Sequence, residues 1–198
     1  MGLALKKPKL YTPAEYLEFE RQSETKHELI DGEIFEIAGA TRNHNRISTN
    51  VVRLLGNQLL ERECNVYSSD MRVKITSTKK YTYPDIVAVC GEELFEDSTE
   101  DTLLNPMLII EVLSKSTEAY DRGAKFEFYQ TIESFQEYVL ISQEPFRVEQ
   151  YVRKTKNEWS YFEFRQAEDI VKLNSIDCEL VLQNIYHKIQ QKFPKEVI

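Results

Sequence analysis

Two carboxylate side chains stand where a buried strand would normally carry only apolar residues. Asp85 follows Pro84 at the start of the apolar run 86–90, and Glu111 interrupts the apolar run 107–113. A carboxylate among apolar side chains is costly unless it is paired, protonated or bound to a cation. Runs this apolar are typical of central strands in a sheet. If the two strands are neighbours, we expect Asp85 and Glu111 to lie close together.

Two converging carboxylates can form an oxygen-ligand site for Mg²⁺ or Mn²⁺. Hydrolysis of a phosphodiester uses such a site, since the metal polarises a phosphoryl oxygen, activates a water and stabilises the leaving oxygen. A structural alternative stays open from these residues alone: Asp85 can end a turn, and Glu111 can pair with a lysine. We therefore treat a metal site at Asp85 and Glu111 as a hypothesis.

An ordered set of short motifs accompanies the two acids. It comprises Glu28 to Glu33, His44, Pro84-Asp85, Pro106, Glu111 to Ser114, Ser116-Thr117, Asp121-Arg122, Lys125 and Tyr129. The set resembles the Uma2 family, formerly a domain of unknown function common in cyanobacteria. The resemblance runs from about Thr12 to Tyr186. It implies a fold of the PD-(D/E)xK restriction-endonuclease-like superfamily with a divalent-metal site, and it implies no known substrate.

The lysine of that superfamily pattern is displaced in this sequence. The pattern implies a lysine two residues after the second acid, where this chain has Leu113. Lys125 is the candidate replacement, because it matches the Asp-x-x-x-Lys pattern of the family and lies near the centre of an inward helical arc. A purely structural pairing of Lys125 with Asp121, one turn earlier, remains the alternative.

Two further residues are candidates for the same site. Asp31-Gly32 predicts a hairpin with a type I′ turn over residues 26–37. We expect Ile30, Phe35 and Ile37 on its inner face with Glu28 among them, so Glu28 is a candidate third acid; a rim glutamate is the alternative. His44 begins the apolar stripe of a predicted helix and is a candidate to touch a metal-bound water or a phosphate; a core or cap histidine is the alternative.

The elements that position these residues predict one mixed α/β pattern. We expect helices over 12–22, 43–62, 121–132 and 182–191, and strands over 65–68, 71–75, 85–90, 107–113, 138–142, 148–153 and 159–165. Residues 77–83 are predicted to form a turn, and the acidic run 91–105 a surface loop. We predict a single restriction-endonuclease-like domain over residues 1–198, with a central mixed β-sheet flanked by helices and a loose N-terminal arm over residues 1–10.

Composition limits the class of protein. The chain has 198 residues and a net charge of −8, which does not favour non-specific binding of duplex nucleic acid. No apolar run is long enough to predict a membrane span. The three cysteines match no disulfide framework, which favours a cytoplasmic location.

Aromatic residues are frequent after residue 137, and cutting a duplex needs two active sites, so we predict a homodimer. These aromatic residues are Tyr138, Phe146, Tyr151, Trp159, Tyr161, Phe162 and Phe164.

The function predicted from the sequence is that of a nuclease dependent on Mg²⁺ or Mn²⁺, with DNA as the expected substrate. Asp85 and Glu111 are expected to hold the metal, Lys125 to orient or activate the water, and Glu28 to assist. The alternative is an inactive nuclease-fold module that binds nucleic acid or a protein partner. A structural or regulatory dimer, in which the buried acids form only ion pairs, is a third hypothesis.

Overall fold

The computed structural model describes residues 9–189, so most of the predicted N-terminal arm lies outside the described residues. The helices are α1 (Pro13–Glu20), α2 (Arg42–Leu59), α3 (Glu118–Tyr120), the π-helical turn η1 (Asp121–Lys125), α4 (Phe126–Gln130) and α5 (Leu182–Ile185). The strands are β1 (His27–Ile30), β2 (Glu33–Glu36), β3 (Cys64–Ser68), β4 (Arg72–Ile75), β5 (Lys80–Thr82), β6 (Ile86–Cys90), β7 (Thr102–Leu103), β8 (Leu108–Leu113), β9 (Glu137–Ser142), β10 (Arg147–Thr155), β11 (Glu158–Phe164), β12 (Ile170–Leu173) and β13 (Cys178–Val181). The predicted mixed α/β class is confirmed.

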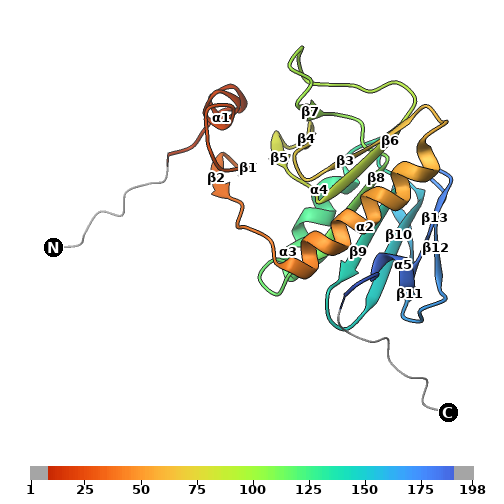
Figure 1. The fold of residues 1–198 in the computed structure, drawn as a ribbon. Coiled ribbons are helices and arrows are strands. Elements are labelled where there is room, and N and C mark those ends of the chain that lie inside the picture. The colour runs from red at the N-terminus through yellow and green to blue at the C-terminus, as the bar shows by residue number, and fades with distance from the viewer. Residues whose placement is uncertain (1–8, 190–198) are drawn as a thin grey trace.

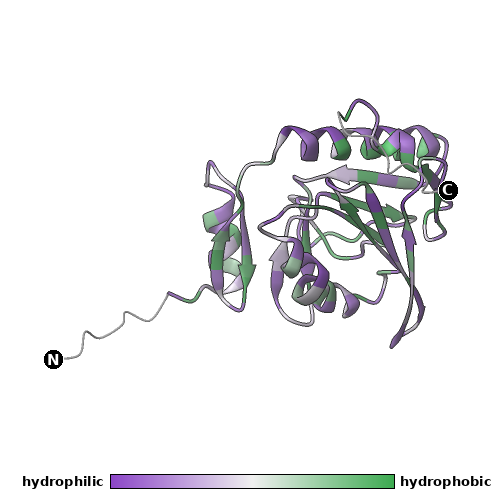
Figure 2. Ribbon diagram, turned by 90° about the horizontal axis from the view of Figure 1, so that it is seen from below, coloured by the Kyte–Doolittle hydropathy of each residue, from purple (hydrophilic) through white to green (hydrophobic). Residues whose placement is uncertain are grey.

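A six-stranded sheet forms the centre of the molecule, in the order β11-β10-β9-β8-β6-β3. The pair β8·β9 is parallel, and the other neighbours are antiparallel. Helix α2 lies along this sheet (Figure 1), and its apolar stripe packs on one face through Ile47, Val51 and Leu55. In Figure 2 this helix carries both purple and green, as expected of a helix with one buried face. Residues of α4 pack on the other face.

Alternation along the central strands decides which layer each side chain joins, because successive side chains of a strand point to opposite faces. In β8, Ile110 and Val112 belong to the core under α2, whereas Ile109 and Leu113 belong to the core under α4. Glu111 therefore points towards α4 and the π-helical turn that precedes it.

A second sheet, in the order β2-β1-β5-β4-β7, carries the N-terminal hairpin. The hairpin turn is the predicted one, with Asp31 and Gly32 both at positive φ (52° and 86°). The predicted inner face is wrong: Phe35 is 50% exposed, and Leu29 of the opposite face is buried against α1 and β5. The hairpin packs on α1, so the face turned to α1 is the apolar one, and Glu28 lies on the other.

Several short elements were not predicted. Residues 80–82 form β5 rather than a turn, and β7, β12 and β13 add further strands. The acidic run 91–105 is largely exposed, as predicted, but ion pairs hold it: Asp97 and Asp101 bind Arg21, and Asp101 also binds Arg72. The last helix ends at Ile185, and the predicted extension beyond 189 lies outside the described residues.

The prediction that no cysteines pair is wrong. Cys64 and Cys90 face each other in the register of β3 and β6 and form a disulfide, while Cys178 is free and buried. The cysteine content therefore gives no support to a cytoplasmic location. Within the part of the chain that the structure describes, no helix is long and apolar enough to cross a membrane.

Candidate active site

The antiparallel register of β6 and β8 brings the two central acids together. Ile86 pairs with Ile110, so Asp85 and Glu111 occupy the next opposed positions at the end of this strand pair. The backbone N–H of Asp85 lies 3.3 Å from Oε2 of Glu111, and the backbone N–H of Val112 donates to Oδ2 of Asp85 at 2.7 Å. Each acid is thus held by the backbone next to the other. Glu111 is buried, while the Asp85 side chain keeps 17% exposure.

Lys125 reaches this pair from the π-helical turn. Its Nζ lies 2.8 Å from Oε1 of Glu111, 3.5 Å from Oε1 of Glu28 and 3.7 Å from Oδ1 of Asp121. The predicted structural pairing with Asp121 is therefore the longest of these contacts, and the pairing with Glu111 is the shortest. A π-helical turn inserts an extra residue into a helix, and such turns are frequent at functional sites. Lys115, the first lysine after Glu111 in the chain, is by contrast exposed on the protein surface.

Burial sets the charge states in this cluster. It raises the pKa of Glu111, with Asp121 and Asp85 adding to the shift and Lys125 opposing it. Burial alone lowers the pKa of a lysine, but the negative charges of Glu111 and Glu28 outweigh it and raise the pKa of Lys125. Lys125 is therefore an ammonium ion that compensates a group of buried carboxylates.

Glu28 lies at the edge of the same cluster. Besides Lys125, its Oε1 accepts a hydrogen bond from the backbone N–H of Tyr83 at 3.1 Å. The side chain is 12% exposed. Glu28 therefore reaches the site from the face of the hairpin opposite to the apolar face of Leu29. The predicted inner face was wrong, and Glu28 nevertheless lies beside Lys125.

His44 approaches from α2, on the opposite layer. Thr41 caps this helix by accepting from the backbone N–H of His44. The imidazole Nε2 lies 3.0 Å from Oδ2 of Asp85, and Nδ1 is buried without a hydrogen-bond partner in the described part of the chain. His44 thus contacts the first acid directly, and it is neither a core residue nor only a cap residue.

Other polar groups of the cluster were not assigned from the sequence. The Tyr129 hydroxyl donates to Oε1 of Glu111 at 3.2 Å and is 3.0 Å from the hydroxyl of Thr82. Tyr129 belongs to the motif set of the sequence and follows Lys125 by one helical turn, so its spacing could also have indicated a role in the cluster. Thr82 and the backbone of Tyr83 carry no comparable signal, because they reach the cluster only through the pairing of β5 with β1.

The donor set fits a hard divalent cation. Within residues 9–189 no cluster of at least three histidine, cysteine, aspartate or glutamate side chains is arranged to hold a metal. Magnesium is commonly bound through one or two carboxylates, with water and phosphate oxygens completing the shell. Asp85 and Glu111 supply such a carboxylate pair at the end of two central strands.

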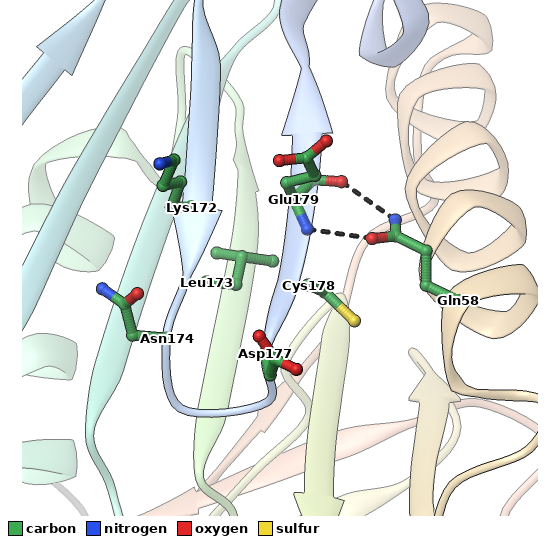
Figure 3. A pocket seen from close by; sticks show the side chains of 7 residues that line it. All are labelled: Gln58, Lys172, Leu173, Asn174, Asp177, Cys178 and Glu179. Carbon is green, nitrogen blue, oxygen red and sulfur yellow. Dashed lines mark hydrogen bonds between the residues drawn. The ribbon is translucent and has the colours of Figure 1, made fainter.

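The hollow drawn in Figure 3 is a different place in the molecule, between α2 and the β12–β13 hairpin. The amide of Gln58 donates to the carbonyl of Glu179 at 2.9 Å and accepts from its N–H at 3.0 Å. This pair of bonds fixes the hairpin to the helix. None of the candidate site residues lines the hollow, which is formed by Gln58, Lys172, Leu173, Asn174, Asp177, Cys178 and Glu179.

Comparisons with known proteins agree with this fold. The model of the Uma2 family, described as "Putative restriction endonuclease", matches residues 13–183. The chain is 44% identical over 151 residues to "Uncharacterized protein sll1609" of Synechocystis sp. (strain ATCC 27184 / PCC 6803 / Kazusa), covering 76% of this chain and 85% of that protein. It is 35% identical over 179 residues to "Uncharacterized protein slr1290" of the same organism, covering 90% and 92%.

A solved structure shares the fold. The crystal structure described as "a putative nuclease belonging to DUF820 from Anabaena variabilis ATCC 29413" matches with a TM-score of 0.73 and 17% identity. The match covers 88% of this chain and 97% of that one. Since the family model matches most of the chain and includes every strand and helix that carries a candidate site residue, the chain belongs to the Uma2 family of restriction-endonuclease-like proteins.

Proposed function

We propose that this protein is a divalent-metal-dependent nuclease that hydrolyses phosphodiester bonds in DNA. One observation carries the proposal: Asp85 and Glu111 converge at the end of two central strands, and the buried ammonium of Lys125 lies against the second acid. The family description and the nuclease named for the similar crystal structure support this assignment.

Each residue has a role that its contacts support. Asp85 and Glu111 would hold Mg²⁺ or Mn²⁺, which when bound supplies Lewis-acid activation of water and phosphate. Lys125 stabilises the negative charge that develops on the phosphate. Glu28 helps to keep Lys125 charged. His44 donates from Nε2 to Asp85, and so fixes the orientation of that carboxylate.

The assembly is part of the proposal. We propose one domain, and a homodimer that presents two sites to the two strands of a duplex. The two protomers would meet through the edge strand β11, where Tyr161 and Phe162 are 49% and 45% exposed. The location we propose is the cytoplasm, where DNA is accessible.

The test of turnover is cleavage of labelled single- and double-stranded DNA and RNA with and without Mn²⁺ or Mg²⁺. We expect metal-dependent cleavage of DNA, and a loss of at least about a hundredfold in Asp85→Asn, which keeps the shape of the side chain and removes its charge. Asp177→Asn is the matched control, because Asp177 is 93% exposed and lies beside the hollow of Figure 3.

The test of metal binding is the melting temperature. A cation that binds only the folded state raises stability by mass action. We expect Mn²⁺ to raise the melting temperature of the parent and of Asp177→Asn, but not of Asp85→Asn. Equal shifts of the melting temperature in all three proteins would contradict a metal site at Asp85. A metal shift without any cleavage would instead favour the inactive nuclease-fold module, in which Leu113 occupies the place of the usual lysine.

A further inference from the structure

Tyr120, the last residue of α3, has a hydroxyl group that is buried and has no hydrogen-bond partner among the described residues. Leaving a buried hydroxyl without a partner has a free-energy cost, so such groups are rare in native proteins and are frequently functional. The Tyr120 ring adjoins the cluster, since Nζ of Lys125 lies 6.0 Å from its centroid.

The neighbouring tyrosine of the cluster shows the contrast. Tyr129 contacts both Glu111 and Thr82 through its hydroxyl, so it is satisfied within the protein. Glu28, whose charge acts on Tyr120, uses its Oε1 to accept from the backbone N–H of Tyr83 and to pair with Lys125. Tyr129 is therefore a structural part of the cluster, whereas no residue within 9–189 accepts a hydrogen bond from the Tyr120 hydroxyl.

The charges around Tyr120 determine what its hydroxyl can do. Burial raises its pKa, and the carboxylates of Glu28, Asp121 and Glu111 raise it further, against the opposing charge of Lys125. The phenol consequently remains protonated at neutral pH, and a protonated phenol can donate a hydrogen bond. Since no described residue accepts this hydrogen bond, an oxygen of a bound ligand can take that place.

We propose that Tyr120 is a substrate-binding residue of the nuclease site and donates its hydrogen bond to a non-bridging oxygen of the phosphodiester. This inference rests on the proposed function, because the phosphodiester is its acceptor. Lys125 and Tyr120 then contact the same phosphate group from adjacent turns of one helix, the ammonium as a charge and the phenol as a directed donor.

The test compares Tyr120→Phe with Tyr129→Phe and the wild type. The probes are fluorescein-labelled single- and double-stranded DNA and RNA, incubated with Mn²⁺, and the steady-state parameters are measured on a probe that the wild type cleaves. For Tyr120→Phe we expect kcat/KM to fall by about tenfold or more, the change expected for one lost hydrogen bond to a charged group. Its melting temperature should stay equal or rise, and its affinity for Mn²⁺ alone should stay unchanged. Tyr129→Phe should lower the melting temperature, because it removes bonds that are made in the folded protein.

Two results would overturn the inference while leaving the nuclease proposal intact. The first is an unchanged kcat/KM in Tyr120→Phe. The second is a melting temperature that falls as far in Tyr120→Phe as in Tyr129→Phe, which would mean that the Tyr120 hydroxyl has a partner inside the protein. A wild type that cleaves none of these probes would overturn the proposed function itself, and the role of Tyr120 with it.

Discussion

Lys125 is almost completely buried, and its ammonium group forms ion pairs with three carboxylates. Burying an ion pair gains little overall, but removing one partner leaves the other charge without compensation in a medium of low dielectric constant. This residue therefore stabilises the metal-free protein as well as taking part in the proposed chemistry. Its two roles can be separated, because stability and cleavage are measured independently.

We predict that Lys125→Met destabilises the metal-free protein by about 3–5 kcal/mol, because Glu111 is left buried beside other acids. Adding Glu111→Gln to that variant should recover part of the loss, since the neutral amide needs no counter-ion. Urea unfolding of the parent, the two single variants and the double variant measures this coupling.

The control is Lys115→Met, which alters an exposed side chain and should change the free energy of unfolding by less than about 0.5 kcal/mol. Additive losses in Lys125→Met and Glu111→Gln would show that the two side chains do not interact, and would contradict the geometry of the cluster.

Asp85 and Glu111 could be named as candidates from the sequence because each places a charge beside or within an apolar run. Lys125 could be named because it matches the Asp-x-x-x-Lys pattern of the family and lies on the inward face of a predicted helix. Tyr120 could not be named from the sequence, because an unsatisfied hydroxyl is a property of the packed structure and leaves no pattern in the chain. The hairpin face was predicted wrongly for the same reason, since the layer that covers Leu29 is helix α1, and its position depends on tertiary contacts.

At the scale of elements, the segment from Gly91 to Asn105 is fixed by ion pairs. Asp101 accepts from Arg21 and forms a 2.8 Å ion pair with Arg72, whose side chain is 3% exposed. Burial raises the pKa of Asp101, but the hydrogen bonds from Arg21 and Thr102 and the charge of Arg72 outweigh it and hold the pKa well below its usual range. The segment is thus joined to α1 and β4.

We predict that Asp101→Asn lowers the free energy of unfolding by about 1–3 kcal/mol at pH 7, because it leaves Arg72 without its counter-charge. The pKa of Asp101 is depressed in the folded state, so its stabilisation is present above the unfolded-state pKa of about 3.9 and is lost as the pH falls below it. Denaturant unfolding at several pH values should therefore show the parent and the variant converging in acid. A difference that stays constant to the lowest pH would contradict this assignment.

The disulfide joins edge strand β3 to β6, the strand that begins beside Asp85. Closing a loop with a sequence separation of 26 is expected to stabilise the fold by about 3 kcal/mol, chiefly through the unfolded chain. We predict that dithiothreitol lowers the melting temperature of the parent and has no effect on Cys64→Ser. Cys178→Ser should respond to dithiothreitol as the parent does, and equal melting temperatures of the parent with and without reductant would contradict the prediction.

Long elements with end signals were predictable, and short ones were not. Thr12, Pro13 and Glu15 form a capping box at the start of α1, and Thr41 caps α2; both helices were predicted. Strands β5 and β7 have only three and two residues, too few for a period to be recognised. The disulfide was missed because the pairing of β3 with β6 depends on strand register, which cysteine spacing does not reveal.

The whole molecule presents one long strand at the edge of its central sheet. β11 has seven residues and pairs with β10 on one side only. An edge strand leaves backbone donors and acceptors available to another chain, and monomeric proteins commonly protect such edges with charged residues. β11 carries Glu158 and Glu163, but between them the adjacent residues Tyr161 and Phe162 are large and about half exposed, one on each face of the strand.

We predict a homodimer in which two copies of β11 meet across a two-fold axis, because an isologous contact can satisfy the same edge in both protomers. Light scattering should give about twice the protomer mass of 23.3 kDa at micromolar concentration. Phe162→Lys should give the protomer mass, because it places two equal charges near the axis and leaves the protomer core unchanged. Ile170→Lys is the matched control: Ile170 is 43% exposed but lies on β12, in a separate sheet, so this variant should remain dimeric. A monomer mass for the parent protein would contradict the predicted homodimer. Dissociation of both variants would contradict a contact through β11.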